Sequence, residues 1–149
     1  MNSATVYLIS REKQSEHGEK TDVIMVKHIM IEDVVTAKPS VTVKDAIKIL
    51  DEKHVGSIII MDESQKCLGI FTERDAIRIV ASDVLLDTAI DQVMTKHVAT
   101  IGEEASLNEA KRLLISHGIR HLPVLNSKEE VVGLLSVRGF LDELFGLSK

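Results

Sequence analysis

Residues 67–75 read Cys-Leu-Gly-Ile-Phe-Thr-Glu-Arg-Asp, and residues 131–139 read Val-Val-Gly-Leu-Leu-Ser-Val-Arg-Gly. The two stretches lie 64 residues apart and carry a glycine and an arginine at matching positions. Working outward from them, the second half of the chain aligns on the first at this offset without a gap. Self-similarity over such a length identifies a tandem duplication, which determines how every other feature is interpreted. Further identical pairs are Met30 and Met94, Val34 and Val98, Thr36 and Thr100, Ala46 and Ala110, and Leu50 and Leu114.

Two apolar runs separated by a polar turn recur in each copy. They predict an antiparallel hairpin of buried strands, and a short β segment precedes each hairpin at some distance. The predicted strands are 34–36, 57–61 and 68–71 in the first copy, and 98–101, 121–125 and 131–135 in the second.

The helices are delimited by capping signals. Thr42–Asp45 and Ser106–Glu109 each place a hydroxyl three residues before an acid, which is the pattern of a capping box. Gly56 and Gly118 follow the expected helix ends, where a left-handed residue is favoured. Closing helices are predicted at 73–84 and 137–145, with short lead-in helices near 26–30 and 88–94. The predicted fold is therefore α+β, with two tandem β-α-β-β-α units.

The repeat boundaries divide the chain into three segments. We expect an N-terminal extension over residues 1–22, the first repeat over 23–84 and the second over 85–149. Within the extension, Thr5 to Ile9 could add an edge strand, and Arg11 to Asp22 is polar and expected to be mobile. We assign the extension no function.

Composition excludes several classes of protein. With 44% hydrophobic and 28% charged residues among 149, the chain is globular. A net charge of −5 disfavours nucleic-acid binding. The lone Cys67 cannot form an internal disulfide, and it is expected to be a small apolar residue beside a strand. No apolar run approaches the roughly 20 residues that span a bilayer, and no signal peptide is evident, so we expect a cytoplasmic protein.

Three motifs carry a family resemblance. They are Val-Met-Thr-Lys-His-Val-Ala-Thr at 93–100, Gly-Ile-Arg-His-Leu-Pro-Val at 118–124 and Gly-Ile-Phe-Thr-Glu-Arg-Asp at 69–75. In order and spacing they resemble the cystathionine-β-synthase (CBS) domain, and the resemblance covers about residues 26–147. It implies two units packed sheet to sheet with pseudo-twofold symmetry, commonly assembled as a homodimer. It also implies clefts that take AMP, ADP, ATP, NAD or S-adenosylmethionine.

The resemblance implies that each cleft is built from both copies. One copy contributes a Thr/Ser-x-x-Asp motif whose carboxylate accepts hydrogen bonds from the ribose hydroxyls, and such charge-assisted bonds are strong. Thr72 and Asp75 keep this motif complete. The other copy, with one strand residue of the first, forms the adenine clamp, predicted as Thr95, Val98, Ala99, Ile119, His121, Pro123 and Ile70.

Each of these site assignments also has a simpler, structural interpretation. Thr72 and Asp75 also form a capping box, and a cap and a ribose site are compatible roles. Arg74, Arg120 and Arg138 are candidates for the phosphate tail, but Arg74 and Arg138 could equally form surface ion pairs, and Arg120 with His121 could lie in a solvated turn. His117 and His121 have ligand-like spacing, but Gly118 interrupts any helix between them, so a metal site is not expected.

The second cleft is degenerate. It would combine Ser136 with Val35, Val55 and Ser57, and its ribose aspartate is replaced by Gly139. The clamp threonine and the motif proline are replaced by Ile31 and Ile59. Losing one or two charged hydrogen bonds, each worth about 1.5–3 kcal/mol, predicts a cleft that binds weakly, binds something different or stays empty.

Three classes of function can be compared with these features. The favoured one is a ligand sensor that binds an adenosine-containing nucleotide and signals to an unknown effector protein. The alternative is an interaction module that binds no nucleotide. An enzyme finds no support, since the sequence holds no phosphate loop, activated nucleophile or metal-ligand set, and no catalytic cofactor is predicted. The identity of the adenosyl ligand and the arrangement of the dimer are left open.

Overall fold

The computed structural model describes residues 24–147, with the predicted N-terminal extension outside this range. The first unit contains β1 (Thr36–Ala37), α2 (Val43–Lys53), β2 (Ser57–Met61), β3 (Cys67–Thr72) and α3 (Glu73–Val80). The second contains β4 (Ile101–Gly102), α4 (Leu107–His117), β5 (His121–Leu125), β6 (Val131–Ser136) and α5 (Val137–Leu144). Two short 3₁₀ helices lead in, η1 (Val26–His28) and η2 (Ile90–Gln92).

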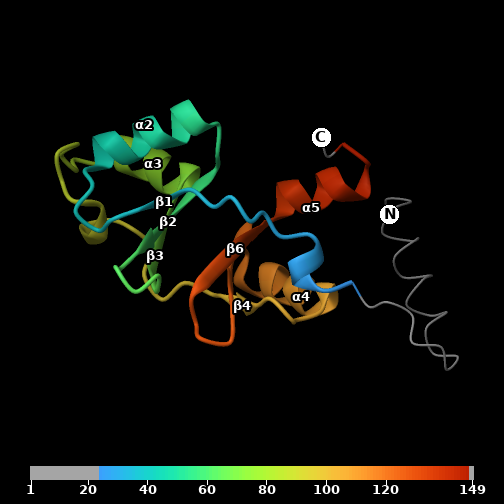
Figure 1. Ribbon diagram of the computed structural model, residues 1–149. Coiled ribbons are helices and arrows are strands. Elements are labelled where there is room, and N and C mark those ends of the chain that lie inside the picture. The colour runs from blue at the N-terminus through green and yellow to red at the C-terminus, as the bar shows by residue number, and fades with distance from the viewer. Residues whose placement is uncertain (1–23, 148–149) are drawn as a thin grey trace, which may run out of the picture.

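Each unit is one three-stranded sheet covered by its helices, and the two units lie side by side (Figure 1). The strand order is β1-β2-β3 in the first sheet and β4-β5-β6 in the second. In each sheet the first strand is parallel to the second, and the second is antiparallel to the third. The predicted α+β fold, with its repeated β-α-β-β-α order and hairpins, is confirmed.

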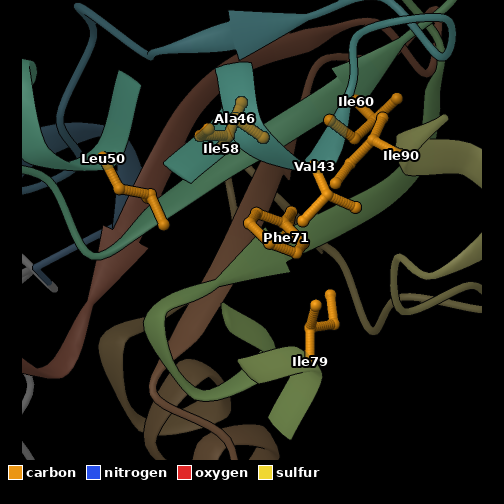
Figure 2. Packing of buried hydrophobic residues seen from close by; sticks show 8 residues of the cluster. All are labelled: Val43, Ala46, Leu50, Ile58, Ile60, Phe71, Ile79 and Ile90. Atoms are coloured by element: carbon orange, nitrogen blue, oxygen red, sulfur yellow. The ribbon is translucent and has the colours of Figure 1, made fainter. Parts of the chain in front are cut away.

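The core of the first unit takes one residue from beyond the unit. The buried cluster joins α2, β2, β3 and α3, and Ile90 of η2 completes it (Figure 2). Ile90 belongs to the second copy of the repeat in sequence, yet it is fully buried against the first. The second core mirrors this arrangement, because Val26 of η1 is fully buried there. The lead-in segments are therefore exchanged between the units.

Backbone hydrogen bonds hold the exchanged segments. Ile90 N donates to Val41 O at 2.7 Å, and at the equivalent position Val26 N donates to Ala105 O at 2.9 Å. Further along the segment that contains Ile90, the backbone pairs with the first unit again. Thr95 and Ile70 exchange two hydrogen bonds of 3.0 Å across the units. Each unit thus contributes backbone to the edge of its neighbour, which ties the two sheets together.

Two glycines of the repeat make this exchange sterically possible. A Cβ atom on Gly69 would lie 2.5 Å from Met94 Sδ, and one on Gly133 would lie 2.5 Å from Met30 Sδ. Real Cβ atoms do not approach other heavy atoms this closely, so a side chain at either position would displace the lead-in segment. The same glycine–methionine contact is thus made twice, once by Gly69 with Met94 and once by Gly133 with Met30. This explains why both residues are identical in the two copies.

Several boundaries differ from the sequence prediction. The first strands, β1 and β4, are shorter than predicted and lie further along the chain. Before β1, Val34 is part of a turn in which its N–H donates to Glu32 O at 3.0 Å, so it does not pair in the sheet. Helix α3 ends at Val80 instead of near residue 84, because the Ser82 amide and hydroxyl both donate to the Ile79 carbonyl, at 3.0 and 2.8 Å.

The predicted role of Gly56 was wrong. The left-handed residue that ends α2 is His54, at φ 54° and ψ 42°. Gly56 is instead a point of close approach to the second copy, because a Cβ atom there would lie 3.2 Å from Nε2 of His121. At the end of α4 the prediction is confirmed, since Gly118 is left-handed at φ 59°.

Candidate functional site

The site begins where β3 passes into α3. Thr72 ends the strand and caps the helix, since its Oγ1 accepts a hydrogen bond from Asp75 N at 3.2 Å. In return, Thr72 N donates to Asp75 Oδ2 at 3.0 Å and Thr72 Oγ1 lies 3.2 Å from the same oxygen. The capping box is complete here, which fixes the direction of the Asp75 carboxylate. Asp75 is 8% exposed, so this acid is held at the edge of a buried region.

The other carboxylate oxygen faces the second copy. Thr95 Oγ1 lies 3.4 Å from Asp75 Oδ1 and 3.5 Å from Oδ2, and its backbone is paired with Ile70. Four predicted site residues from both copies therefore meet at one place. Sequence reasoning missed a fifth, Arg78, whose Nη2 lies 3.4 Å from Asp75 Oδ1. The only signal in the sequence was the three-residue spacing between the acid and the base on one helix.

His121 lies on the seam between the sheets. Its imidazole is beside Gly56, and the Glu73 carboxylate approaches the same point. Burial lowers the pKa of His121, and the nearby Arg120 cation lowers it further, while the Glu73 carboxylate opposes both. The imidazole is therefore held neutral near pH 7, with one ring nitrogen able to donate and the other able to accept.

The remaining clamp residues are spread around this seam. Val98 and Ala99 are half-buried, with Ala99 packed on the second core together with Ile119. Pro123 is fully buried in β5 opposite Leu134, so its side chain shapes the sheet from within. A groove of about 670 Å³ opens beside Val98, the one clamp residue that lines it. Its other lining residues are Lys66, Cys67, Leu68, Lys96, His97, Thr100, Leu125 and Glu129.

The three candidate tail residues lie on the surface. Arg74, Arg120 and Arg138 are exposed, and none forms an ion pair with a residue that the structure describes. Arg120 is fixed through its backbone, since its carbonyl accepts from Val137 N at 2.9 Å. These guanidinium groups are therefore available to bind an anion that approaches the N-terminus of α3 or of α5.

The second cleft differs where the sequence differs. Ser136 Oγ caps α5 by accepting from Gly139 N at 2.9 Å, with no carboxylate in the first turn of that helix. Ile31, the equivalent of Thr95, lies beside this position, since its Cδ1 would be 3.7 Å from a Cβ on Gly139. The polar pair of Thr95 and Asp75 thus corresponds to an isoleucine and a glycine in the second cleft. Of the other residues predicted here, Val35 and Val55 pack on the first core, and Ser57 is buried with no hydrogen-bond partner for Oγ.

The site has the chemistry of a binding site. Its groups are one buried carboxylate, hydroxyls, a neutral imidazole and peripheral guanidinium groups, which suit a polyhydroxylated, anionic ligand. Within residues 24–147 no group of three or more metal-ligating side chains comes together. Over the same range, every helix is too short or too polar to cross a bilayer.

The chain is similar in sequence to a known family profile and to individual proteins. The family profile described as the CBS domain matches residues 26–82 and 90–146. An uncharacterized 17.7 kDa protein from Acidianus ambivalens is 33% identical over 113 residues, covering 76% of this chain and 68% of the relative. The inosine-5′-monophosphate dehydrogenase of Bifidobacterium longum is 33% identical over 113 residues, covering 75% of this chain but 21% of the enzyme.

A solved structure matches both units together. The CBS domain pair of protein MJ0100, in complex with 5′-methylthioadenosine and S-adenosyl-L-methionine, superposes with a TM-score of 0.75 at 27% identity. The match covers 85% of this chain and 99% of that one. The chain thus corresponds to nearly all of a ligand-binding domain pair and to about a fifth of the dehydrogenase.

Proposed function

The chain belongs to the CBS-domain family, and from this premise we propose that it is a regulatory module that binds an adenosine-containing nucleotide between its two units. The observation that carries the proposal is the Asp75 carboxylate, buried at the seam and directed at Thr95 of the other copy. A vicinal diol of a ribose would donate to this carboxylate, replacing the long contacts from Thr95.

The ligand class follows from chemistry that the candidate ligands share. The related domain pair was crystallised with two ligands that both contain adenosine. AMP, ADP, ATP and NAD contain the same group, so Asp75 and the clamp would serve any of them. Arg74 and Arg120 are the side chains that would discriminate between tails, because cations at the rim favour phosphate over the neutral thioether of methylthioadenosine. We favour an adenine nucleotide for this reason.

The proposal assigns no reaction to these 149 residues. The dehydrogenases among the relatives match over about a fifth to a quarter of their length, and the matched part corresponds to the tandem CBS domains. A regulatory module acts by binding one arrangement of its units better than another. We infer that the ligand changes the relation between the units, and that an effector protein responds to this change.

We further propose that the module forms a homodimer. Ile77 on α3 and Leu141 on α5 are equivalent in the two repeats, and both are exposed, at 71% and 41%. Val80 on α3 and Phe145, directly after α5, are exposed apolar residues as well. Two related apolar faces suit a second copy, which would bury both at once.

The unpaired thiol of Cys67 is compatible with a reducing, cytoplasmic location.

Calorimetric titration tests the proposed function. Purified protein is titrated with AMP, ATP, NAD and S-adenosylmethionine, and the titration is repeated on Asp75→Ala and on Asp45→Ala. Asp45 occupies the same position in the first turn of α2, outside the candidate site, so its variant controls for the loss of an acid from the first turn of a helix. We expect one site per chain, weakened at least about tenfold by Asp75→Ala and unchanged by Asp45→Ala. The absence of heat with all four ligands would instead favour an interaction module, for which the missing carboxylate of the second cleft is the supporting observation.

A further inference from the structure

Arg78 connects the candidate ribose site to the segment that leads into the clamp. Its Nη2 lies 3.4 Å from Asp75 Oδ1 and donates to the carbonyl of Val93 at 3.1 Å. Val93 ends η2, two residues before Thr95 and five before Val98. One guanidinium nitrogen therefore joins the carboxylate of the first copy to the backbone that positions the clamp of the second.

The duplication contains an internal comparison for this contact. The residue equivalent to Asp75 is Gly139, and the residue equivalent to Arg78 is Asp142. The copy that lacks the carboxylate also lacks the guanidinium. The acid and the base are thus present together in one copy and absent together in the other, as expected of residues that act as a pair.

The partners of the carboxylate show what the arginine does there. Asp75 Oδ2 is held by the Thr72 amide and hydroxyl, while Oδ1 lies 3.4 Å from both Arg78 Nη2 and Thr95 Oγ1. A carboxylate has about four acceptor positions, so an incoming diol must displace a contact. Arg78 is a cation whose Nη2 also donates to the Val93 carbonyl at 3.1 Å, whereas Thr95 contributes a neutral hydroxyl at 3.4 and 3.5 Å. Thr95 is therefore the contact that a diol would replace, and Arg78 the one that would remain.

We propose that Arg78 is a positioning residue, which orients Asp75 for the ribose and couples occupancy of that site to the backbone at Val93–Thr95. The inference rests on the proposed function, and it adds the route by which binding reaches the second unit. When the diol displaces Thr95 from the carboxylate, the segment keeps its tie through Val93 and moves with α3. Without Arg78, contact of the ribose with Asp75 would no longer affect the position of the segment Val93–Thr95.

A double-mutant cycle tests the inference. AMP is titrated into the wild type, Arg78→Gln, Asp75→Asn and the double variant, with Arg112→Gln on exposed α4 as the charge-matched control. We expect Arg78→Gln to weaken AMP binding roughly three- to tenfold in the wild type and less than about twofold in Asp75→Asn. Arg78→Lys should restore most of the loss, and Arg112→Gln should have no effect. Equal losses in both backgrounds would overturn the role of Arg78 while leaving the proposed function intact.

A second measurement does not depend on the ligand. Amide hydrogen exchange at Thr95, whose N–H donates to Ile70 O at 3.0 Å, should accelerate in Arg78→Gln and not in Arg112→Gln. A wild-type protein that binds no AMP, ATP, NAD or S-adenosylmethionine overturns the proposed function. Unchanged amide exchange at Thr95 in Arg78→Gln overturns the coupling through Val93, whether or not the wild type binds a ligand.

Discussion

At the scale of single residues, the packing of the two units affects the charge of His121. Its imidazole lies against Gly56 at the seam, with the Glu73 carboxylate and the Arg120 cation as its charged neighbours. Burial lowers the pKa of His121, so the folded protein takes up this proton less readily than the unfolded chain does. The contribution of His121 to stability is therefore complete above the ordinary histidine pKa of about 6.5 and is lost as pH falls below it.

We predict that His121→Gln reduces the dependence of stability on pH. The free energy of unfolding of the wild type should decrease between about pH 7.5 and pH 5.5, and that of the variant should decrease less. Urea denaturation at a series of pH values measures both. The remaining histidines are common to the two proteins, so their contribution cancels in the comparison. Parallel pH profiles would mean that His121 titrates as if it were in water.

At the scale of elements, the two copies end their first helices with the same backbone but different residues. His54 and Gly118 both occupy the left-handed region, at φ 54° and φ 59°. The His54 side chain is exposed, and nothing lies within 4 Å of a Cβ added to Gly118. The two positions therefore differ in conformational strain and in little else.

A reciprocal pair of substitutions tests this interpretation. We expect His54→Gly to raise the free energy of unfolding by about 0.5–1 kcal/mol, because relief of left-handed strain exceeds the added entropy of the unfolded chain. Gly118→Ala should lower it by about 1 kcal/mol for the converse reason. Thermal or chemical denaturation gives both values. A destabilised His54→Gly would show that the imidazole makes a contact that outweighs the strain.

At the scale of the whole molecule, the exchange of lead-in segments makes the two units one cooperative structure. Ile90 completes the first core and Val26 completes the second, each from across the boundary between the copies. Neither unit can then lose its core without releasing a segment of the other. Unfolding should be a single transition in spite of the two separate sheets.

We predict that Ile90→Ala destabilises both units alike. The cavity in the first core should cost about 2–4 kcal/mol, and hydrogen exchange should accelerate by a similar factor in β2 and in β5. Val26→Ala is the matched variant in the second core, expected to act in the same way with a smaller cost. Exchange that accelerates only in the first unit would contradict a shared transition.

Much of this protein could be predicted from sequence, because the relevant signals are local or repeated. The offset of 64 residues establishes the duplication, paired apolar runs with a polar turn between them identify the hairpins, and Thr72 with Asp75 combines a cap with a family motif. Each of these depends on residues a few positions apart, or on the similarity of one copy to the other. The order of elements and the unequal composition of the two clefts follow from them.

The tertiary structure alone decided which copy each segment serves. A repeat offset identifies Ile90 as the equivalent of Val26, but it cannot say that each is buried in the other copy's unit. The contacts of Arg78 with Val93 and of His121 with Gly56 likewise join residues whose proximity depends on how the sheets meet. Sequence patterns record the preferences of neighbouring residues, whereas these contacts arise from packing between distant ones.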